Sequence, residues 1–270
     1  MKTEKSEPDW RKGELTARRV LLEEGYEHLG DVNLDDFAQL RGVTVRDLTL
    51  TGCEGRLVRR GKKAILSVSS SINLLTRRRF VIAHELGHFE LHEHLSNLDL
   101  VQCDAEVISE RYNLGPEKEA NVFAAEFLMP RAVWSKMVDV PEPSLEMIGK
   151  LANRFQISLT AATIRFCKLT DDRCCCVFVR NGIVDWVVPS KTFGYWIDDG
   201  VKALPQTLAH NFFRKHSVPD EPQFVGSSAW LDQPESGLEE IQEDLRKITD
   251  DASLSLLWIP SDPSEDDDGR

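Results

Sequence analysis

Long hydrophobic runs are absent from this 270-residue sequence. No apolar stretch approaches the roughly 18 residues that a membrane-spanning helix needs. The N-terminal residues, MKTEKSEPDW, are charged and polar and show none of the apolar core of a secretory signal peptide. These absences predict a cytoplasmic protein without a membrane-embedded part.

Cysteine is scarce, with six residues in the chain, and three of them are adjacent. Neighbouring cysteines pair poorly with each other, because a disulfide demands particular Cα separations. On a strand Cys174 and Cys176 face one way and Cys175 the other, so the three cannot chelate one ion together. We expect them to be reduced, buried, small hydrophobic side chains.

Positive charge is also in deficit: 33 lysines and arginines face 45 acidic residues, which gives a net charge of −12. An acidic chain repels nucleic-acid phosphate unless basic side chains are concentrated somewhere. The tight basic run at positions 77–79 is interpreted as the solvated start of a helix, with contact to an acidic substrate segment as the alternative. Direct binding to nucleic acid is not expected.

Hydrophobic spacing predicts an α+β fold with a boundary near residue 170. Before it we expect helices at 14–27, 33–41, 75–92 and 116–128, a β-hairpin at 55–69 and a helix–turn–helix-like segment at 143–168. After it we expect a β-hairpin around Asn181-Gly182, because this dipeptide suits a type I′ turn. A helical stretch at 201–215, a loop at 217–237, an amphipathic segment at 238–250, a strand at 253–259 and a disordered acidic tail at 261–270 complete the prediction.

The sequence His84-Glu85-Leu86-Gly87-His88 lies inside one of these helices. Histidines four residues apart share a helix face, so both imidazoles can reach one metal ion, for which Zn²⁺ is predicted at one per chain. Glu85 is placed beside them to act as general base toward a water molecule. Gly87 costs up to ~1 kcal/mol relative to alanine in a helix, which indicates a close approach by another backbone or the substrate cleft.

A catalytic zinc site needs a third protein ligand, for which Glu117 is the candidate. It shares a helix face with Asn121, and zinc would offset the cost of turning this carboxylate toward the core. Asn121 is expected to orient one ligand histidine through its second ring nitrogen. Glu119, on another face of the helix, is the alternative ligand.

Three further side chains lie close to these motifs in the sequence. His92 is one turn beyond His88, about 5 Å along the axis, and is interpreted as a packed or solvent-edge histidine. His94 lies at the end of the helix, where a protonated side chain interacts favourably with the helix dipole, and no further role is predicted for it. Tyr112 is a candidate donor to a tetrahedral oxyanion.

The segments RRRFVIAHELGHFELH and EKEANVFAAEFLMP, in this order, resemble the paired signature of the ImmA/IrrE family of zinc metallopeptidases. The similarity covers about residues 15–168. It implies a zincin-like fold in which His84 and His88 are the histidine ligands, Glu117 is the glutamate ligand and Glu85 is the catalytic base. The expected domains are a metallopeptidase domain at 1–142, the helix–turn–helix-like segment packed on it at 143–170, and a smaller C-terminal α+β domain at 171–260 for which a regulatory role is expected.

The resemblance further implies an endopeptidase whose protein substrate is a helix–turn–helix transcriptional repressor of a stress or mobile-element response. The strand at 63–69 is expected to pair with an extended substrate segment. The alternative is a DNA-binding or metal-sensing regulator without turnover. A DNA-reading role would use the second helix of the 143–168 segment, whose basic side chains are Arg165 and Lys168.

Overall fold

The structure is a computed structural model that describes residues 10–92, 115–138 and 142–260. The described chain forms two compact units. The N-terminal unit holds the residues up to 138 together with 152–158, and the C-terminal unit holds 142–151 and 159–260. This division runs through the 143–170 segment, and the domain limits predicted above stay predictions. None of the helices in the described ranges is long and apolar enough to cross a bilayer.

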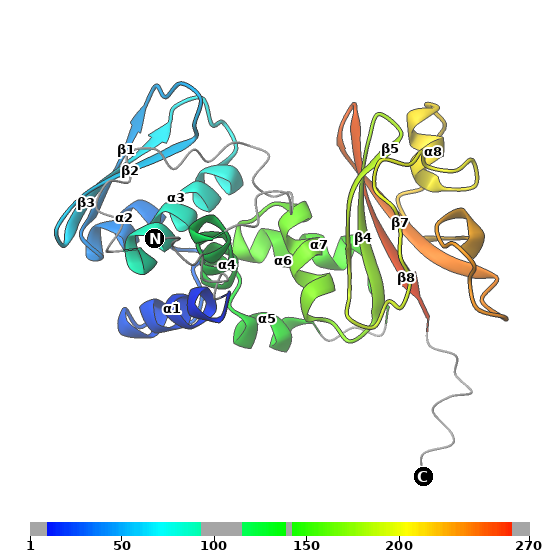
Figure 1. Ribbon diagram of the computed structural model, residues 1–270, viewed down its shortest axis with the longest axis horizontal. Coiled ribbons are helices and arrows are strands. Elements are labelled where there is room, and N and C mark those ends of the chain that lie inside the picture. Colours follow the sequence, from blue (N-terminus) through cyan, green and yellow to red (C-terminus); the bar gives the residue numbers. More distant parts are fainter. Residues whose placement is uncertain (1–9, 93–114, 139–141, 261–270) are drawn as a thin grey trace, which may run out of the picture. The chain divides into compact units, whose positions relative to one another are not determined.

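The N-terminal unit contains a three-stranded sheet in the order β1-β3-β2 (Figure 1). The predicted hairpin is confirmed, because β2 and β3 pair antiparallel around the turn at Gly61. A strand that the sequence analysis missed, β1, pairs parallel with β3. The central strand is therefore β3, and both of its edges are occupied. The bounds are β1 Val43–Leu48, β2 Gly55–Arg60 and β3 Lys63–Ser69.

Within the described ranges five helices accompany this sheet, and most follow the predicted pattern. Asn33 caps α2 by accepting a hydrogen bond from the backbone N–H of Asp35, and Pro116 opens α4 at a position where a missing N–H costs nothing. The helix at 116–128 has the predicted bounds, whereas the short α5 was not predicted. The helices are α1 Trp10–Glu23, α2 Leu34–Leu40, α3 Leu75–Leu91, α4 Pro116–Leu128 and α5 Arg131–Met137.

The contact between α3 and α4 is close because of Gly87. A Cβ atom at this position would lie 3.1 Å from Ala120 Cα and 3.1 Å from Phe123 Cδ1. The two backbones therefore approach to a distance that a larger side chain would prevent. This confirms close approach of another backbone as the reason for a glycine inside the histidine helix.

The basic run at the start of α3 is not a solvated surface, so the first interpretation was wrong. Arg77 Nε donates to Glu54 Oε2 over 2.8 Å, and Arg78 forms ion pairs with Asp35 and Asp47. Arg79 is buried and donates to the backbone carbonyl oxygens of Leu29 and Val32, in the loop between α1 and α2. Intramolecular acceptors hold these arginines, because α3 begins against the acidic turns of α2 and the sheet.

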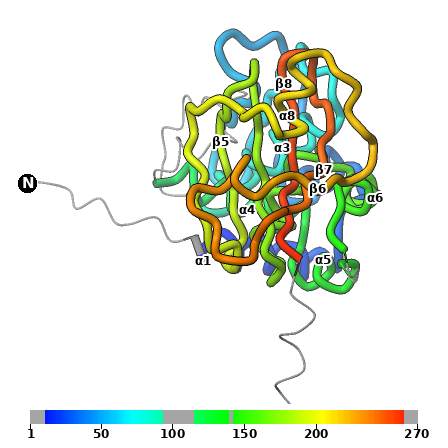
Figure 2. The backbone as a smooth tube through the Cα atoms, turned by 90° about the vertical axis from the view of Figure 1, so that its right-hand side faces the viewer, coloured from blue at the N-terminus to red at the C-terminus, as the bar shows by residue number. Residues whose placement is uncertain are grey.

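The C-terminal unit is built on a five-stranded antiparallel sheet in the order β5-β4-β8-β7-β6. Figure 2 shows β6, β7 and β8 side by side. Asn181 and Gly182, with φ angles of 52° and 77°, form the predicted turn between β4 and β5. The strands are β4 Arg173–Arg180, β5 Ile183–Pro189, β6 Gln223–Gly226, β7 Glu240–Thr249 and β8 Ala252–Ile259.

The helix pair predicted at 143–168 consists of α6 Leu145–Phe155 and α7 Leu159–Leu169, with the break at Gln156 in a left-handed conformation of φ 51°. The predicted helical stretch at 201–215 is shorter, because α8 comprises only Leu208–Phe213 and begins after its capping residue Thr207. The predicted loop at 217–237 contains β6 and a 3₁₀ turn at Ser227–Ala229.

The three adjacent cysteines lie on β4, and all three are fully buried. They are free thiols, and burial raises the pKa of Cys174, Cys175 and Cys176 above the usual range. Both faces of this strand are thus covered. The interpretation as buried small hydrophobic side chains is confirmed.

Candidate metal centre

Two histidines of α3 and one glutamate of α4 converge at the centre of the N-terminal unit. His84 Nε2 and His88 Nε2 lie 3.0 Å apart, and Glu117 places Oε2 3.2 Å from the first and Oε1 3.3 Å from the second. Both histidines are fully buried. These three side chains form a group that could hold a metal ion.

The hydrogen bonds around the histidines decide which ring nitrogens face the centre. His84 Nδ1 lies 2.8 Å from Asn121 Oδ1, an acceptor, so Nδ1 carries the proton and Nε2 presents a lone pair. Asn121 thus lies where the sequence analysis expected a partner for a ligand histidine. Two lone pairs and a carboxylate facing one another across about 3 Å repel each other unless a cation lies among them.

The spacing between the donor atoms of the three side chains suits zinc. A tetrahedral ion with bonds of about 2.0–2.1 Å requires neighbouring donor atoms roughly 3.3 Å apart. The separations of 3.0, 3.2 and 3.3 Å are close to this value. Two imidazoles and one carboxylate are also a donor set that catalytic zinc sites use. The residues present therefore fit the predicted metal.

The Glu117 carboxylate is held in its charged form. Burial raises its pKa, but hydrogen bonds from His84 and His88, which require a proton on Nε2, and the charge of these rings when protonated outweigh burial and lower the pKa to about 2. For His88 burial dominates and lowers the pKa, which favours the neutral imidazole that metals bind. The charge states of both side chains suit metal coordination at neutral pH.

The alternative ligand, Glu119, lies elsewhere. Its Oε2 atom is 3.2 Å from His92 Nε2 and 3.5 Å from Lys12 Nζ. His92 in turn places Nδ1 3.0 Å from His88 Nδ1. His92 is buried, as a packed histidine would be, but it contacts a predicted ligand directly. The contact of His92 with Glu119 was missed because it depends on the packing of α3 on α4. For the contact of His92 with His88, the spacing of four residues was the available signal.

Glu85 is fully buried on α3, one residue from His84. A Cβ atom on Gly55, the first residue of β2, would lie 2.6 Å from Glu85 Oε1 and 2.8 Å from Val81 Cγ1. The backbone of β2 therefore forms a wall against which the Glu85 carboxylate rests. No local pattern indicated a role for Gly55, since its contact with Glu85 joins the sheet to the helix across 30 positions.

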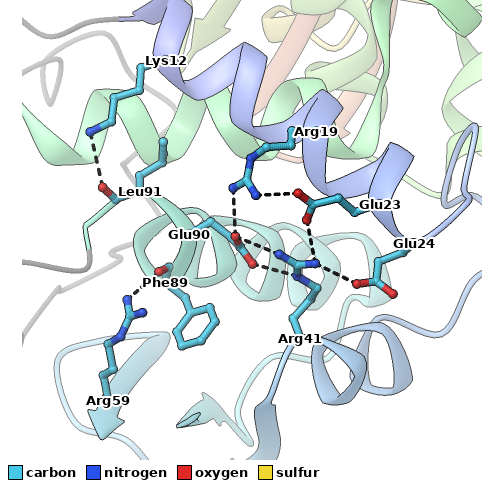
Figure 3. Close-up of polar contacts among 9 residues, drawn as sticks. All are labelled: Lys12, Arg19, Glu23, Glu24, Arg41, Arg59, Phe89, Glu90 and Leu91. Atoms are coloured by element: carbon cyan, nitrogen blue, oxygen red, sulfur yellow. Dashed lines mark hydrogen bonds and ion pairs between the residues drawn. The ribbon is translucent and has the colours of Figure 1, made fainter. Parts of the chain in front are cut away.

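A network of ion pairs fixes the C-terminal end of α3 (Figure 3). Arg41 donates to Glu90 Oε1 over 2.9 Å and to Glu24 Oε1 over 2.8 Å, and Arg19 donates to Glu90 Oε2 over 3.3 Å. Glu90 follows His88 by two residues, and its side chain is only 8% exposed. The network anchors the helix that carries the histidines to α1 and to the end of α2.

Two residues named in the sequence analysis, Tyr112 and His94, lie outside the described residues. The expected donation by Tyr112 to an oxyanion stays a prediction.

The arrangement defines a class: a mixed α+β domain in which a helix bearing two histidines packs on a helix bearing a glutamate to form a metal-binding group. Residues 38–166 match the family model described as the IrrE N-terminal-like domain, Peptidase M78. This part of the chain belongs to the IrrE N-terminal-like domain family and includes all three residues of the metal-binding group.

Two known proteins are similar to the chain. Metallopeptidase ImmA of Bacillus subtilis (strain 168) is 33% identical over 76 residues, which are 28% of this chain and 40% of ImmA. The matched segment thus spans less than half of that relative. A solved structure, a Mycobacterium tuberculosis transcriptional regulator, superimposes with a TM-score of 0.58 over 92% of this chain and 76% of that chain. Its sequence identity of 16% limits this likeness to the fold.

Proposed function

We propose that this protein is a zinc-dependent endopeptidase that hydrolyses peptide bonds in a protein substrate. The observation that carries the proposal is the convergence of His84, His88 and Glu117 beside Glu85 in a domain of a peptidase family. Three protein ligands leave one position of a tetrahedral ion open, as catalytic zinc sites do and closed structural sites do not. One zinc ion per chain is therefore proposed.

His84, His88 and Glu117 would hold the ion. When bound, zinc would lower the pKa of a water molecule toward about 7 and polarise the scissile carbonyl group. The second nitrogens of the histidines are engaged by Asn121 and His92, which keeps both Nε2 atoms directed at the centre.

Glu85 is proposed as the general base. Its carboxylate would accept the proton of the attacking water and later deliver it to the leaving amine nitrogen, so that one group serves both halves of the hydrolysis. The place of Glu85 between the two ligands on α3 suits this role. Contact with the backbone at Gly55 restricts the positions open to the carboxylate.

An extended substrate segment is proposed to pair with β2 rather than with β3. The expectation that residues 63–69 receive the substrate was wrong, because β3 is paired on both sides. Within the described residues β2 pairs only with β3. Because β2 begins at Gly55, beside Glu85, this strand is the proposed partner for an extended substrate segment.

The proposed substrate is a helix–turn–helix transcriptional repressor. This choice rests on the resemblance to the ImmA/IrrE family and on the similarity to metallopeptidase ImmA over one segment. The test is co-expression with repressors encoded beside the gene, with wild type compared to Glu85→Gln. Wild type is expected to shorten one repressor and Glu85→Gln to leave it intact. Equal shortening by both would contradict the role of Glu85, and intact repressors in both would contradict the substrate class.

The alternative is a DNA-binding or metal-sensing regulator without turnover. For DNA reading the second helix of the 143–168 segment would have to present its basic side chains. Arg165 is buried on α7, which leaves Lys168 exposed. A single exposed basic side chain is fewer than DNA-reading helices present to the bases and phosphates. Peptide hydrolysis is therefore the preferred proposal.

A further inference from the structure

His92 and Glu119 extend outward from the metal-binding group in one line. His88 Nδ1 lies 3.0 Å from His92 Nδ1, and His92 Nε2 lies 3.2 Å from Glu119 Oε2. Lys12 Nζ approaches the same carboxylate oxygen from α1 at 3.5 Å. Both imidazoles are buried, with His92 only 3% exposed. Three helices thus contribute to one chain of polar contacts that ends on a predicted metal ligand.

A single set of proton positions satisfies the whole chain. If His88 binds a metal through Nε2, its proton is on Nδ1 and is donated to His92 Nδ1. His92 must then carry its own proton on Nε2, from which it donates to Glu119 Oε2. Each ring is neutral, and each contact has one donor and one acceptor. The opposite tautomers would place a proton on His88 Nε2, where it would block the metal.

The charge of Glu119 is offset by a cation on another helix, Lys12 of α1. Lys12 balances the charge of Glu119, so the carboxylate need not take a proton from His92. The negative charge of Glu119 and the positive charge of Lys12 therefore cancel, and the two imidazoles between Glu119 and the metal-binding group can both be neutral.

We propose that His92 and Glu119 form a positioning relay that fixes the Nδ1–H tautomer and the ring orientation of His88 and thereby raises the metal affinity of the site. Carboxylate–histidine pairs of this kind orient metal ligands in many proteins, and their loss typically costs about 10–100-fold in metal affinity. The relay is the counterpart, on His88, of the contact that Asn121 makes with His84. It rests on the proposed zinc site and gives Glu119 a role other than that of a ligand.

The test measures zinc affinity by chelator competition on the full-length protein, together with the melting temperature of the metal-free form. His92→Leu removes the acceptor and donor with little change in volume, and we expect about 10–100-fold weaker zinc binding. His92→Asn restores an acceptor near the Nδ1 position, and we expect it to recover most of the affinity. The melting temperature of the metal-free protein should remain near that of wild type, because the relay acts on the ligand.

A matched pair of carboxylate-to-amide changes completes the design. Glu119→Gln weakens the acceptor for His92 and should lower zinc affinity in the same direction as His92→Leu. Glu243→Gln alters a buried carboxylate on β7 of the C-terminal unit, which contains none of the three proposed ligands, so zinc affinity should remain unchanged. If His92→Leu fails to fold, this pair and His92→Asn still decide the question.

The outcomes separate the relay from the proposed function. Tight zinc binding by wild type with equal affinity in His92→Leu, or in Glu119→Gln where the former does not fold, would overturn the relay and leave the peptidase proposal standing. A loss of metal-free stability in His92→Leu without recovery of affinity in His92→Asn would reduce His92 to a structural role and also overturn it. Absence of zinc binding by wild type would refute the zinc site itself.

Discussion

At the scale of single residues, the candidate site depends on what surrounds each functional side chain. Asn121 and His92 direct the two histidines, and the backbone of Gly55 confines Glu85. The sequence motif predicted the inner residues from helical spacing alone, because positions four apart share a face. The contacts of Gly55 with Glu85 and of His92 with Glu119 could not be predicted in this way, since they arise only when the sheet and the helices pack.

Gly55 supplies a prediction at this scale. In Gly55→Ala the new Cβ would lie 2.6 Å from Glu85 Oε1 and 2.8 Å from Val81 Cγ1, so the Glu85 carboxylate must move. Zinc content should stay at the wild-type level, because Gly55 contacts none of the three ligands. Repressor cleavage should fall by a large factor, up to the ~10²–10⁴ that general-base help contributes.

Metal analysis and the cleavage assay on the same preparation check this prediction. The matched control is Gly226→Ala, since a Cβ at Gly226 meets nothing within 4 Å. Cleavage by Gly55→Ala at the rate of the control would show that the wall does not hold the carboxylate.

At the scale of helices and strands, the close contact of α3 and α4 brings the ligands together. Gly87→Ala would place a Cβ 3.1 Å from Ala120 Cα, a backbone atom that can yield only if α4 moves. Overpacking of this kind costs ~1–3 kcal/mol, which exceeds the gain of up to ~1 kcal/mol from alanine as a better helix former. We expect lower stability and weaker zinc binding, because the shift of α4 carries Glu117 with it.

Urea denaturation of both forms checks this expectation, with Gly149→Ala as control. Gly149 also lies inside a helix, but a Cβ there would meet only Leu159 Cδ1 at 3.9 Å. This change should be neutral or stabilising by up to ~1 kcal/mol. Equal effects of the two substitutions would show that the approach of α3 to α4 is not tight enough to demand glycine.

Elements with a clear local signal were predictable from the sequence. Pro116 and the apolar spacing after it predicted α4, and Asn181-Gly182 predicted the β4–β5 turn. The edge strand β1 was missed because most of its side chains are exposed, so it lacks the alternation that marks a half-buried strand. The short α5, of seven residues, offers too few turns for a helical period.

Strand β7 was not predicted as a strand, because it contains buried acidic residues. Segment 238–250 was described only as amphipathic, because Glu243 and Asp244 break the apolar alternation of a strand. Both carboxylates are buried, where Glu243 accepts from the backbone N–H groups of Leu208 and Ala209, and Asp244 accepts from that of Leu145. Burial raises the pKa of both carboxyl groups. These long-range partners cannot be read from the local sequence.

At the scale of the whole molecule, the chain has two units, and the candidate metal centre belongs to one of them. A ligand stabilises the part that binds it, by about 2.7 kcal/mol at a free concentration 100 times the dissociation constant. Zinc is therefore expected to raise the melting temperature of the N-terminal unit, while the C-terminal unit melts as it does without metal.

Calorimetry of the full-length protein with and without zinc checks this prediction. His88→Ala should abolish the zinc-dependent shift, because it removes a ligand. A shift of the same size in His88→Ala would show that zinc acts elsewhere on the molecule.

The central claim is that His84, His88 and Glu117 hold one zinc ion while Glu85 remains outside the coordination sphere. It is tested most directly by the zinc content per chain of purified wild type, Glu117→Ala and Glu85→Gln. The account predicts about one zinc per chain in wild type and in Glu85→Gln, and loss of most of it in Glu117→Ala. Full zinc retention in Glu117→Ala, or loss of zinc in Glu85→Gln, would contradict the account.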